Sequence, residues 1–458
     1  MESGPQLFGT DGVRGVAGEY PLDRATVWKL GCALGKVLQR SADGRPIRVV
    51  LGRDTRESGP WIADLFATGL ASAGVGVGDA GVVTTPGVAY LTRSHGFAAG
   101  VVISASHNPF RDNGIKVFST AGTKLPESVE VEIERAMEEV TAEASASNGF
   151  VEPVADLERD YVTFLANLAS GLEGLPSLRL VADCAYGAAA RVAPDLLQEL
   201  GIPVQVLNAS PDGRNINLNC GSLHPEGLAD ATRAAGADLG VAFDGDADRA
   251  KFATRSGRVL DGDYVLYAAA QLLQDRRELR GGAVVGTLMS NFALERELAL
   301  RGLGLKRAAV GDRYVLEEML RSGINLGGEP SGHIIFADQS LAGDGLITLL
   351  QVLRIVSETG KSLEELVSGY APLPQLILNV RVRTKPPLES IPEIRDAIEA
   401  CRRNIDGNGR VVVRYSGTEP LARVMVEAED GVVVERHAEA IAGAIESAIG
   451  EGAAHSGS

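Results

Sequence analysis

The stretch VVISASHNPFRDNG, residues 101–114, begins as an apolar run and becomes polar at Ser104. The apolar part predicts a buried strand, which ends directly in two serines, a histidine, an asparagine and a proline. A surface turn needs only one or two such residues. Ligands of open α/β sheets bind at the carboxyl ends of the strands. We therefore expect an α/β fold in which this strand carries a functional loop at its end.

The same pattern recurs along the chain. Apolar, strand-like runs that enter polar loops occupy residues 47–54, 99–106, 178–185, 238–245 and 283–290. Apolar residues recur at helical spacing between them, in residues 24–39, 60–73, 188–200, 263–274 and 312–321. This alternation predicts βα units with a largely parallel sheet. After about residue 370 a smaller unit follows, in the order strand, helix, strand, turn, strand and helix.

Length, composition and charge limit the class of protein. A chain of 458 residues is too long for one hydrophobic core, so we expect two to four domains. Its apolar runs fall short of the roughly 18 residues that cross a bilayer, and its first residues lack the pattern of a secretory signal. The net charge of −16 disfavours partners such as nucleic acid or anionic membranes. The four cysteines form no CxxC pair, and we expect a cytoplasmic protein without a disulfide framework.

The hexapeptide DGDADR, residues 244–249, places three aspartates directly after an apolar run. Like charges a few Å apart repel by about 1 kcal/mol even in water, and a divalent cation removes this repulsion. An EF-hand requires glycine at its sixth position and glutamate at its twelfth, where this chain has Arg249 and Arg255. The motif therefore predicts a magnesium site, because Mg²⁺ takes a few carboxylates together with phosphate oxygens. The alternative is a solvated acidic turn.

Three further motifs are less specific on their own. SASHNP, residues 104–109, lacks the GxSxG pattern of hydrolases, but a phosphorylated serine there would add an anionic ligand to a magnesium site. GGEPSGH, residues 327–333, offers groups that suit sugar hydroxyls on a glycine-rich loop. RYSGTEP, residues 414–420, combines a guanidinium group, two hydroxyls and a glycine turn, as phosphate-binding loops do. The alternatives are a polar turn for the first motif and a capped hairpin for the last.

A fifth stretch, GVGDAG at residues 76–81, fits the dinucleotide fingerprint GxGxxG. That fingerprint requires a strand before it, a helix that opens on it and an acidic residue about 20 positions later. Here Pro86 stands where the helix should run, and the region near residue 100 is apolar. We interpret these residues as ordinary turn glycines. The alternative is that the chain is an NAD-dependent oxidoreductase.

Together and in this order, the four motifs are similar to those of the α-D-phosphohexomutase family. The resemblance covers residues 1–450 and extends to stretches outside the motifs: FGTDGVRG at 8–15, DNGIK at 112–116, GTLMSN at 286–291 and VGDRYVLE at 310–317. It implies a four-domain phosphohexomutase architecture, with three α/β domains of mixed sheets and a smaller C-terminal α+β domain. The boundaries expected are 1–150, 151–257, 258–370 and 371–450, with a disordered tail at 451–458.

The resemblance also implies the roles of individual residues. Ser106 would carry a phosphate and, with Asp244, Asp246 and Asp248, would hold one Mg²⁺. Five further residues match family positions around the transferring phosphoryl group: Arg14, His107, Lys116, Arg249 and His333. Of these, Lys116 is the first candidate for the general acid–base and His333 the second. Glu329 and Ser331 match the binders of sugar hydroxyls. The positions that match the phosphate-binding loop are those of Arg414, Ser416, Gly417, Thr418 and Arg423.

The activity implied is a mutase reaction on a small sugar phosphate. Phosphoserine would pass its phosphoryl group to O1 of glucosamine 6-phosphate, giving a bound sugar 1,6-bisphosphate that returns its 6-phosphate to Ser106. The product, glucosamine 1-phosphate, would feed the synthesis of UDP-N-acetylglucosamine and cell-wall precursors. The alternatives are a mutase of the same family that acts on glucose or mannose phosphates and a non-catalytic sugar-phosphate-binding relative. A homodimer is left open.

One departure from the family pattern concerns the metal loop, which commonly has a glycine where this chain has Ala247. A left-handed backbone at this position would cost an alanine on the order of 1 kcal/mol. We therefore expect an ordinary backbone angle at Ala247.

Overall fold

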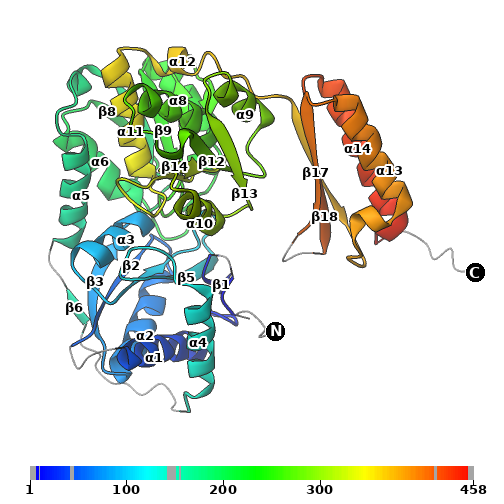
Figure 1. Ribbon diagram of the computed structural model, residues 1–458. Coiled ribbons are helices and arrows are strands. Elements are labelled where there is room, and N and C mark those ends of the chain that lie inside the picture. The colour runs from blue at the N-terminus through cyan, green and yellow to red at the C-terminus, as the bar shows by residue number, and fades with distance from the viewer. Residues whose placement is uncertain are drawn as a thin grey trace, which may run out of the picture. The chain divides into compact units, whose positions relative to one another are not determined.

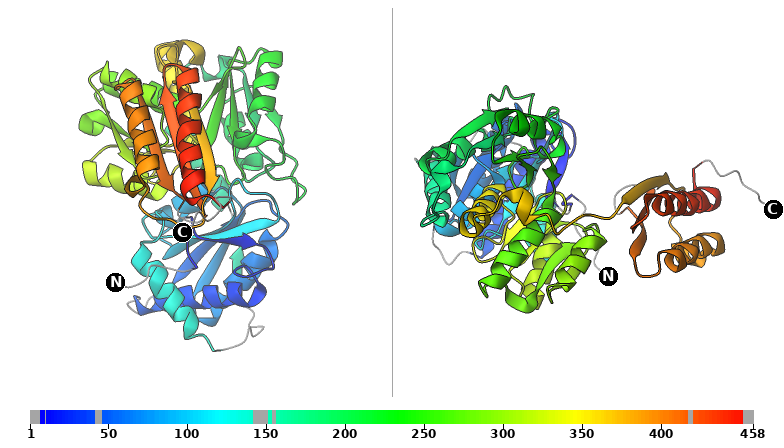
Figure 2. Two further views of the ribbon diagram at one scale, coloured as in Figure 1. Left: turned by 90° about the vertical axis from the view of Figure 1, so that its right-hand side faces the viewer. Right: turned by 90° about the horizontal axis from the view of Figure 1, so that it is seen from above.

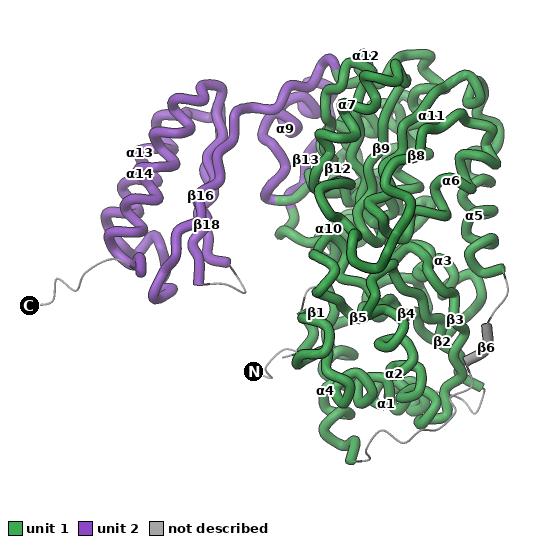
Figure 3. Tube along the Cα trace, turned by 180° about the vertical axis from the view of Figure 1, so that it is seen from behind, with its two compact units in different colours: residues 1–287, 308–367 green, residues 288–307, 368–458 purple. Residues whose placement is uncertain are grey.

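The computed structural model describes residues 7–9, 11–41, 46–141, 151–153, 156–416 and 420–451, for 151–153 as backbone alone. It divides into two compact units (Figure 3). Unit 1 consists of Met1–Thr287 and Ala308–Val367, and unit 2 of Leu288–Arg307 and Ser368–Ser458. The expected disordered tail lies, beyond residue 451, outside the described residues. None of the described helices combines the length and the apolar character that crossing a bilayer demands.

The first sheet of unit 1 is mixed (Figure 1). In spatial order its strands are β1 (Val13–Val16), β5 (Asp112–Phe118), β4 (Ala99–Ile103), β2 (Arg48–Arg53), β3 (Gly76–Val82) and β6 (Val151–Pro153). β4, β2, β3 and β6 run parallel, whereas β5 pairs antiparallel with both β1 and β4. The expected strand that ends in SASHNP is β4, in the middle of this sheet.

Helices cover both faces of the first sheet, which explains why its central strands are apolar throughout. The helices of this region are α1 (Arg24–Arg40), α2 (Gly59–Ser72), α3 (Thr85–Ser94) and α4 (Glu127–Glu138). Successive side chains of a strand point to opposite faces. In β2, Val49 and Leu51 therefore join the core formed with α1, α2 and α4, while Val50 between them joins the core formed with α3.

The GVGDAG stretch forms strand β3, so our interpretation of it as turn glycines is wrong. Pro86 does not prevent the following helix, because it lies in the first turn of α3, where a proline lacks no hydrogen bond. The side chain of Thr84 caps this helix by accepting from the Gly87 N–H. The helix begins beyond the glycines rather than on them.

The second and third sheets of unit 1 follow along the chain. The second has the order β11 (Val259–Leu260), β10 (Ala250–Thr254), β9 (Leu239–Phe243), β7 (Leu180–Asp183) and β8 (Val204–Leu207). Its helices are α5 (Leu157–Leu168), η1 (Leu175–Ser177), α6 (Ala189–Glu199), η2 (Gly221–Leu223) and α7 (Glu226–Ala235). Within unit 1 the third sheet pairs β12 (Ala283–Thr287) in parallel with β14 (Leu326–Gly328), and β14 antiparallel with β15 (Ile334–Phe336). Its helices are α8 (Gly262–Asp275), η3 (Arg280–Gly282), α10 (Asp312–Ser322), α11 (Gly345–Thr359) and α12 (Leu363–Leu366).

Unit 2 contains α9 (Phe292–Ala299), most of β13 (Gly304–Ala308) and the C-terminal part of the chain. That part is an antiparallel sheet of β16 (Gln375–Arg381), β18 (Leu421–Ala428) and β17 (Gly409–Tyr415), with η4 (Leu388–Ser390) after β16. Figure 2 shows its two helices, α13 (Pro392–Ile405) and α14 (Gly431–Ile449), on one face of this sheet. The observed order confirms the predicted smaller α+β unit.

The expected strands and helices of the α/β part are likewise confirmed, each within a few residues of its predicted ends. The sheets of unit 1 are mixed rather than largely parallel, because β5 and β10 return as antiparallel neighbours.

Candidate active site

The loop between β4 and β5 holds Ser106 in an unusual conformation. Its backbone has a φ of 51°, in the left-handed region, and its side chain is fully buried. The Ser106 N–H donates to the Ser104 hydroxyl at 2.9 Å, and that hydroxyl donates to Asp54 at 2.6 Å. The loop thereby turns the Ser106 hydroxyl away from its own sheet, and its Oγ donates to Asp244 Oδ2 at 2.7 Å.

The loop between β9 and β10 brings the three predicted carboxylates together. Asp244, Asp246 and Asp248 each offer an oxygen within 4.8 Å of the others, and all three side chains are buried. Burial, and then the neighbouring Asp248 and Asp246, raise the pKa of Asp244 well above its ordinary value. Three buried carboxylates so close together are unfavourable unless a cation neutralises them.

Two oxygens of this cluster fit a metal ion. Asp246 Oδ1 and Asp248 Oδ1 are buried, and neither accepts a hydrogen bond from the described residues. Buried polar atoms in proteins normally have partners. An all-oxygen donor set of carboxylates and a serine oxygen suits a hard cation such as Mg²⁺ rather than a metal that prefers thiolate or imidazole.

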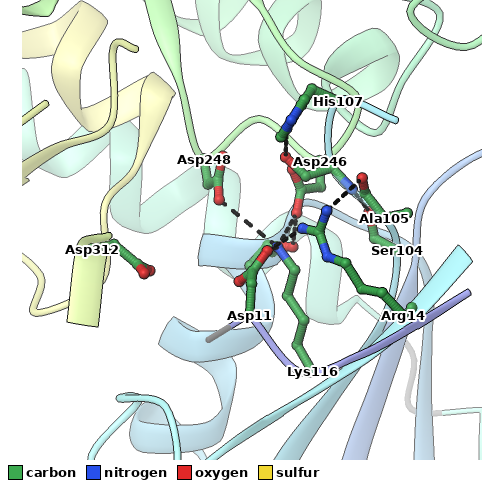
Figure 4. Close-up of polar contacts among 12 residues, drawn as sticks. Asp11, Arg14, Ser104, Ala105, His107, Lys116, Asp246, Asp248 and Asp312 are labelled. Atoms are coloured by element: carbon green, nitrogen blue, oxygen red, sulfur yellow. Dashed lines mark hydrogen bonds and ion pairs between the residues drawn. The ribbon is translucent and has the colours of Figure 1, made fainter. Parts of the chain in front are cut away.

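Lys116 of β5 lies at the centre of the charged groups (Figure 4). Its Nζ is 2.9 Å from Asp246 Oδ2, 3.3 Å from Asp11 Oδ2 and 3.8 Å from Asp248 Oδ2. Burial disfavours the charged amine, but Asp11 and Asp246 outweigh it, so the pKa of Lys116 is raised above its ordinary value. Asp246 Oδ2 also accepts from the Thr85 hydroxyl at 2.5 Å.

Two carboxylates that carry no predicted role connect this centre to the third sheet. Asp11 lies beside β1 and forms ion pairs with Arg14 and, at 2.6 Å, with Lys124. Lys124 also reaches Asp312, the first residue of α10, at 2.7 Å. Burial tends to raise the pKa of Asp11, but the positive charges of Lys116 and Lys124 outweigh this effect, so the pKa lies below its ordinary value.

The two predicted histidines have opposite electrostatic surroundings. His107 Nδ1 lies 3.2 Å from Ser106 Oγ, and burial together with the cations Arg249 and Arg14 lowers its pKa to about 4. His333 Nδ1 lies 3.6 Å from Asp248 Oδ2. Burial disfavours the charged ring of His333, but Asp248 and Asp312 raise its pKa above the ordinary value. His333 Nε2 is buried and forms no hydrogen bond with the described residues.

The remaining predicted residues of unit 1 lie around the same centre. Arg14 Nη1 donates to the Ala105 carbonyl at 3.3 Å. The Arg249 N–H donates to Asp244 Oδ1 at 3.3 Å, and its Nε lies 3.8 Å from Asp248 Oδ1. Glu329 and Ser331 sit on the β14–β15 hairpin, and the Ser331 hydroxyl donates to the Glu329 carboxylate at 3.4 Å. The same carboxylate accepts from the Gly311 N–H at 2.9 Å.

A cavity of about 420 Å³ opens beside these groups. Lys116, Asp248, Asp312 and His333 line one part of it, and most of its remaining wall is apolar. Its volume is within the range of small-molecule sites in proteins.

The expectation for Ala247 is wrong. Its φ is 58°, so the alanine adopts the left-handed conformation that glycine usually supplies. The Ala247 N–H donates to the Asp244 carbonyl at 3.1 Å, and its carbonyl accepts from the Gly345 N–H at 3.0 Å. These bonds turn the chain back so that Asp248 rejoins the other two carboxylates, and they offset the strain.

Gly245, two positions earlier, is required for space. A Cβ at this position would lie 2.5 Å from the Ser106 carbonyl oxygen. The carbonyl of Gly245 accepts from the Ala188 N–H at 2.8 Å, and a Cβ at Gly187 would lie 2.3 Å from that carbonyl oxygen. Three loops therefore touch through their backbones at this point.

The predicted phosphate loop lies in unit 2. Arg414 of β17 and Arg423 of β18 are directly opposite each other across the two strands. Burial and the neighbouring Arg423 lower the pKa of Arg414. The Ser416 carbonyl accepts from Lys385 Nζ at 2.7 Å. Gly417 and Thr418 lie outside the described residues.

Sequence reasoning missed several residues of the site. Asp11 and Asp312 belong to the stretches FGTDGVRG and VGDRYVLE, which carried the family resemblance without a role for either carboxylate. Arg56, Lys124 and Thr85 gave no signal, because their importance depends on contacts with residues more than 45 positions away.

Comparison with known proteins agrees with this geometry. The models described as phosphoglucomutase/phosphomannomutase alpha/beta/alpha domains I, II and III match residues 5–144, 159–257 and 261–373, and the C-terminal domain of the same family matches residues 377–444. A protein named phosphoglucosamine mutase from Koribacter versatilis is 49% identical over 454 residues, which cover 97% of each chain. Another of that name, from Solibacter usitatus, is 50% identical over 97% of this chain and 99% of its own.

Among solved structures, a phosphoglucomutase/phosphomannomutase family protein from Burkholderia thailandensis superposes with a TM-score of 0.78 at 25% identity, over 96% of this chain and 97% of its own. These matches extend over almost the whole chain and confirm the resemblance that the four motifs indicated. The chain therefore belongs to the phosphoglucomutase/phosphomannomutase family, the α-D-phosphohexomutases.

Proposed function

We propose that this chain is a phosphoglucosamine mutase, which interconverts glucosamine 6-phosphate and glucosamine 1-phosphate. The observation that carries the proposal is the contact of Ser106 Oγ with Asp244 in a buried cluster of three carboxylates. A buried hydroxyl at a cation site is suited to carry a phosphoryl group. The name shared by the curated relatives supports glucosamine phosphate as the substrate.

In this proposal Ser106, Asp244, Asp246 and Asp248 hold one Mg²⁺. The bound ion would draw charge from the phosphoryl oxygens and so ease the transfer. Support for this assignment comes from Oδ1 of Asp246 and Oδ1 of Asp248, which are buried and accept no hydrogen bond from the described residues. Arg249 and Arg14 would place their guanidinium groups beside the equatorial oxygens of the phosphoryl group, where positive charge favours the transition state.

The reaction divides into two transfers that use the same serine. In the first, the bond between Ser106 Oγ and phosphorus breaks while O1 of glucosamine 6-phosphate bonds to phosphorus. The O1 proton passes to a base, and Ser106 Oγ takes up a proton. In the second, the bisphosphate has turned over and its O6–phosphorus bond breaks. Ser106 Oγ bonds to phosphorus and gives up its proton, and O6 receives a proton. The sugar 1,6-bisphosphate is thus the intermediate and also the species that restores a dephosphorylated enzyme.

The contacts favour His333 over Lys116 as the group that moves this proton. Nζ of Lys116 lies close to Asp246 and Asp11, and both carboxylates stabilise its charged form. A general acid–base must release its proton in one of the two transfers. We therefore assign Lys116 as a fixed positive charge beside the phosphoryl group. His333, whose Nε2 forms no hydrogen bond with the described residues and lies 3.9 Å from Asp312 Oδ2, is assigned as the proton carrier. His107 would contact the phosphoryl group as a neutral ring.

The other predicted residues would bind the substrate. Glu329 and Ser331 would bond the sugar hydroxyls, since both sit on one hairpin with a carboxylate held by the Gly311 N–H. The phosphate that is not reacting would be bound by the loop of unit 2, through Arg414, Ser416, Gly417, Thr418 and Arg423. A cytoplasmic location is supported by four cysteines that are all free thiols. A homodimer stays a prediction.

Two measurements test the proposal. Turnover is compared on glucosamine 6-phosphate, glucose 1-phosphate and mannose 1-phosphate, and we expect the highest kcat/KM on the amino sugar. Mass spectrometry of the purified chain should find phosphate on Ser106. A higher kcat/KM on glucose or mannose 1-phosphate would assign the chain to the related mutases, and absence of both phosphate and turnover would leave a sugar-phosphate-binding protein.

A further inference from the structure

Arg56 is a buried cation that no step of the proposed reaction uses. It follows strand β2, and its side chain is among the largest that are fully buried in the described chain. Its Nε forms an ion pair of 2.9 Å with Asp54. A buried arginine with a single carboxylate partner requires further acceptors for its remaining N–H groups.

Those acceptors are four backbone carbonyls of one loop. Nη2 of Arg56 donates to the carbonyls of Ser106 and Asn108, each at 2.9 Å. Nη1 donates to the carbonyls of Asp112, at 3.0 Å, and Pro109. The planar, five-donor guanidinium group is the only side chain that can bond so many fixed acceptors at once.

A second contact supports the same carbonyls from another strand connection. Asn217 Nδ2 donates to the Ser106 carbonyl at 2.9 Å and to the Asn108 carbonyl at 3.3 Å. The Ser106 carbonyl therefore accepts two hydrogen bonds, while its residue holds a left-handed backbone angle. Such a conformation persists only where the surroundings hold it.

The direction of the Ser106 carbonyl fixes the direction of the next N–H. In a trans peptide the C=O of one residue and the N–H of the next point to opposite sides. The carbonyl of Ser106 points at Arg56, so the His107 N–H points away from it. Within the described residues this N–H donates no hydrogen bond. At Asn108 the same arrangement leaves no donor, because Pro109 has no N–H.

We infer that Arg56 is a positioning residue for the phosphoryl transfer: it orients the Ser106–His107 peptide so that the His107 N–H donates to an oxygen of the phosphoryl group on Ser106. This inference rests on the proposed role of Ser106. Arg56 itself touches neither substrate nor phosphate. Its effect is to keep a backbone donor aligned before the reaction begins, which avoids reorganisation during the transfer.

The test uses Arg56→Lys, which keeps the charge against Asp54 but cannot bond four carbonyls. The matched control is Arg53→Lys, three residues earlier on β2, where the arginine pairs with Asp79 at 3.0 Å and does not contact the loop. Full-length enzymes are phosphorylated with glucose 1,6-bisphosphate, and transfer to glucosamine 6-phosphate is followed in a single turnover. Circular dichroism and Tm report on the fold of each variant.

We expect Arg56→Lys to transfer about 100-fold more slowly than wild type, as when one oxyanion donor is lost, with KM for the sugar phosphate within threefold. Asn217→Ala should give a smaller loss of the same kind, and guanidinium ion should restore part of the rate to Arg56→Ala. Transfer by Arg56→Lys within threefold of wild type, or losses of kcat and KM that match those of Arg53→Lys, would overturn the inference. If the wild type carries no phosphate on Ser106, the proposed function fails, and this inference with it.

Discussion

The charged groups around Ser106 and those of the C-terminal sheet solve the problem of buried charge in different ways. In unit 1 the cation Lys116 already has carboxylate neighbours, Asp246 and Asp11. In unit 2 Arg414 and Arg423 face each other across two strands, and burial, then Arg423, lower the pKa of Arg414. Like charges directly opposite on neighbouring strands destabilise a sheet.

The difference shows what each region is built to receive. Around Ser106 carboxylates and cations lie side by side, and two buried carboxylate oxygens that accept no hydrogen bond from the described residues suit one cation. In unit 2 the two arginines lie opposite each other, an arrangement that an anion bound between them would stabilise. In the proposed function, the first region would carry out chemistry at a fixed point, and the second would bind whichever phosphate is not reacting.

The strongest test removes the serine. Ser106→Ala should abolish mutase turnover and leave the fold intact, because the hydroxyl is proposed to carry the phosphate and contributes no apolar packing. Steady-state kinetics and circular dichroism measure the two effects. Ser72→Ala on α2, where the hydroxyl donates to the Gly69 carbonyl at 2.7 Å, is the control and should retain full activity. Turnover of Ser106→Ala within tenfold of wild type would contradict the assignment.

Next in size is the removal of one carboxylate charge. Asp246→Asn should weaken Mg²⁺ binding and turnover together, by about two orders of magnitude, since this residue serves both the cation site and Lys116. Calorimetry with Mg²⁺ and kinetics give the two readouts. The control is Asp79→Asn, which removes a carboxylate that pairs with Arg53 outside the cluster. It should change neither Mg²⁺ binding nor turnover. Full activity of wild type after EDTA treatment would show that the cluster is not a metal site.

Much of this comparison could be predicted from the sequence, and the reason lies in how local each feature is. Ser106 and the three aspartates sit in short motifs at the ends of strands, and the structure brings these four residues together. Arg414 opens a third motif, and Arg423 follows it within β18. Arg56 and Lys124 could not be found in this way, because each acts on residues distant in the chain. The fold class followed from the alternation of strands and helices, but the antiparallel partners β5 and β10 did not, since pairing direction depends on tertiary connections.

Backbone conformation was the other feature that could not be predicted from the sequence. A left-handed alanine contradicts local preference, and only the two hydrogen bonds of Ala247 explain it. The GVGDAG stretch also misled, because glycines are common in turns and the buried strand they form here depends on neighbours on both sides.

A moderate effect is expected from the arginine pair of unit 2. Arg423→Ala should lower kcat/KM by about one to two orders of magnitude, because a charge-assisted arginine–phosphate contact is worth roughly 1.5–3 kcal/mol. Arg423→Lys should recover part of the loss, since lysine keeps the charge without the planar fork. Kinetics on both variants provide the measurement. A loss below threefold for alanine, or complete recovery with lysine, would mean that Arg423 does not clamp a phosphate.

The smallest effect concerns pH and a buried carboxyl of unit 1. Burial raises the pKa of Asp344 to about 6, although Tyr161 donates to it at 2.6 Å. Between pH 5 and 6 the folded chain therefore keeps a proton that the unfolded chain has lost, and stability falls by about 1 kcal/mol as pH rises through this window. Asp344→Asn cannot titrate and should lack this part of the slope. Urea unfolding at pH 5 and 6 compares the two proteins, and equal slopes would exclude the effect.

The backbone contact at Gly245 constrains how this protein can be recombined with its relatives. A methyl group at Gly245 or Gly187 would meet a carbonyl oxygen at 2.5 or 2.3 Å, so the packing among the loops that carry Ser106, Gly187 and Gly245 leaves no room for a side chain at either glycine. The first of these loops belongs to the matched domain I and the other two to domain II. A chimaera that joins domain I of one parent to domain II of another would therefore have to keep glycine at both positions, even though the domain boundary lies between Ser106 and the two glycines.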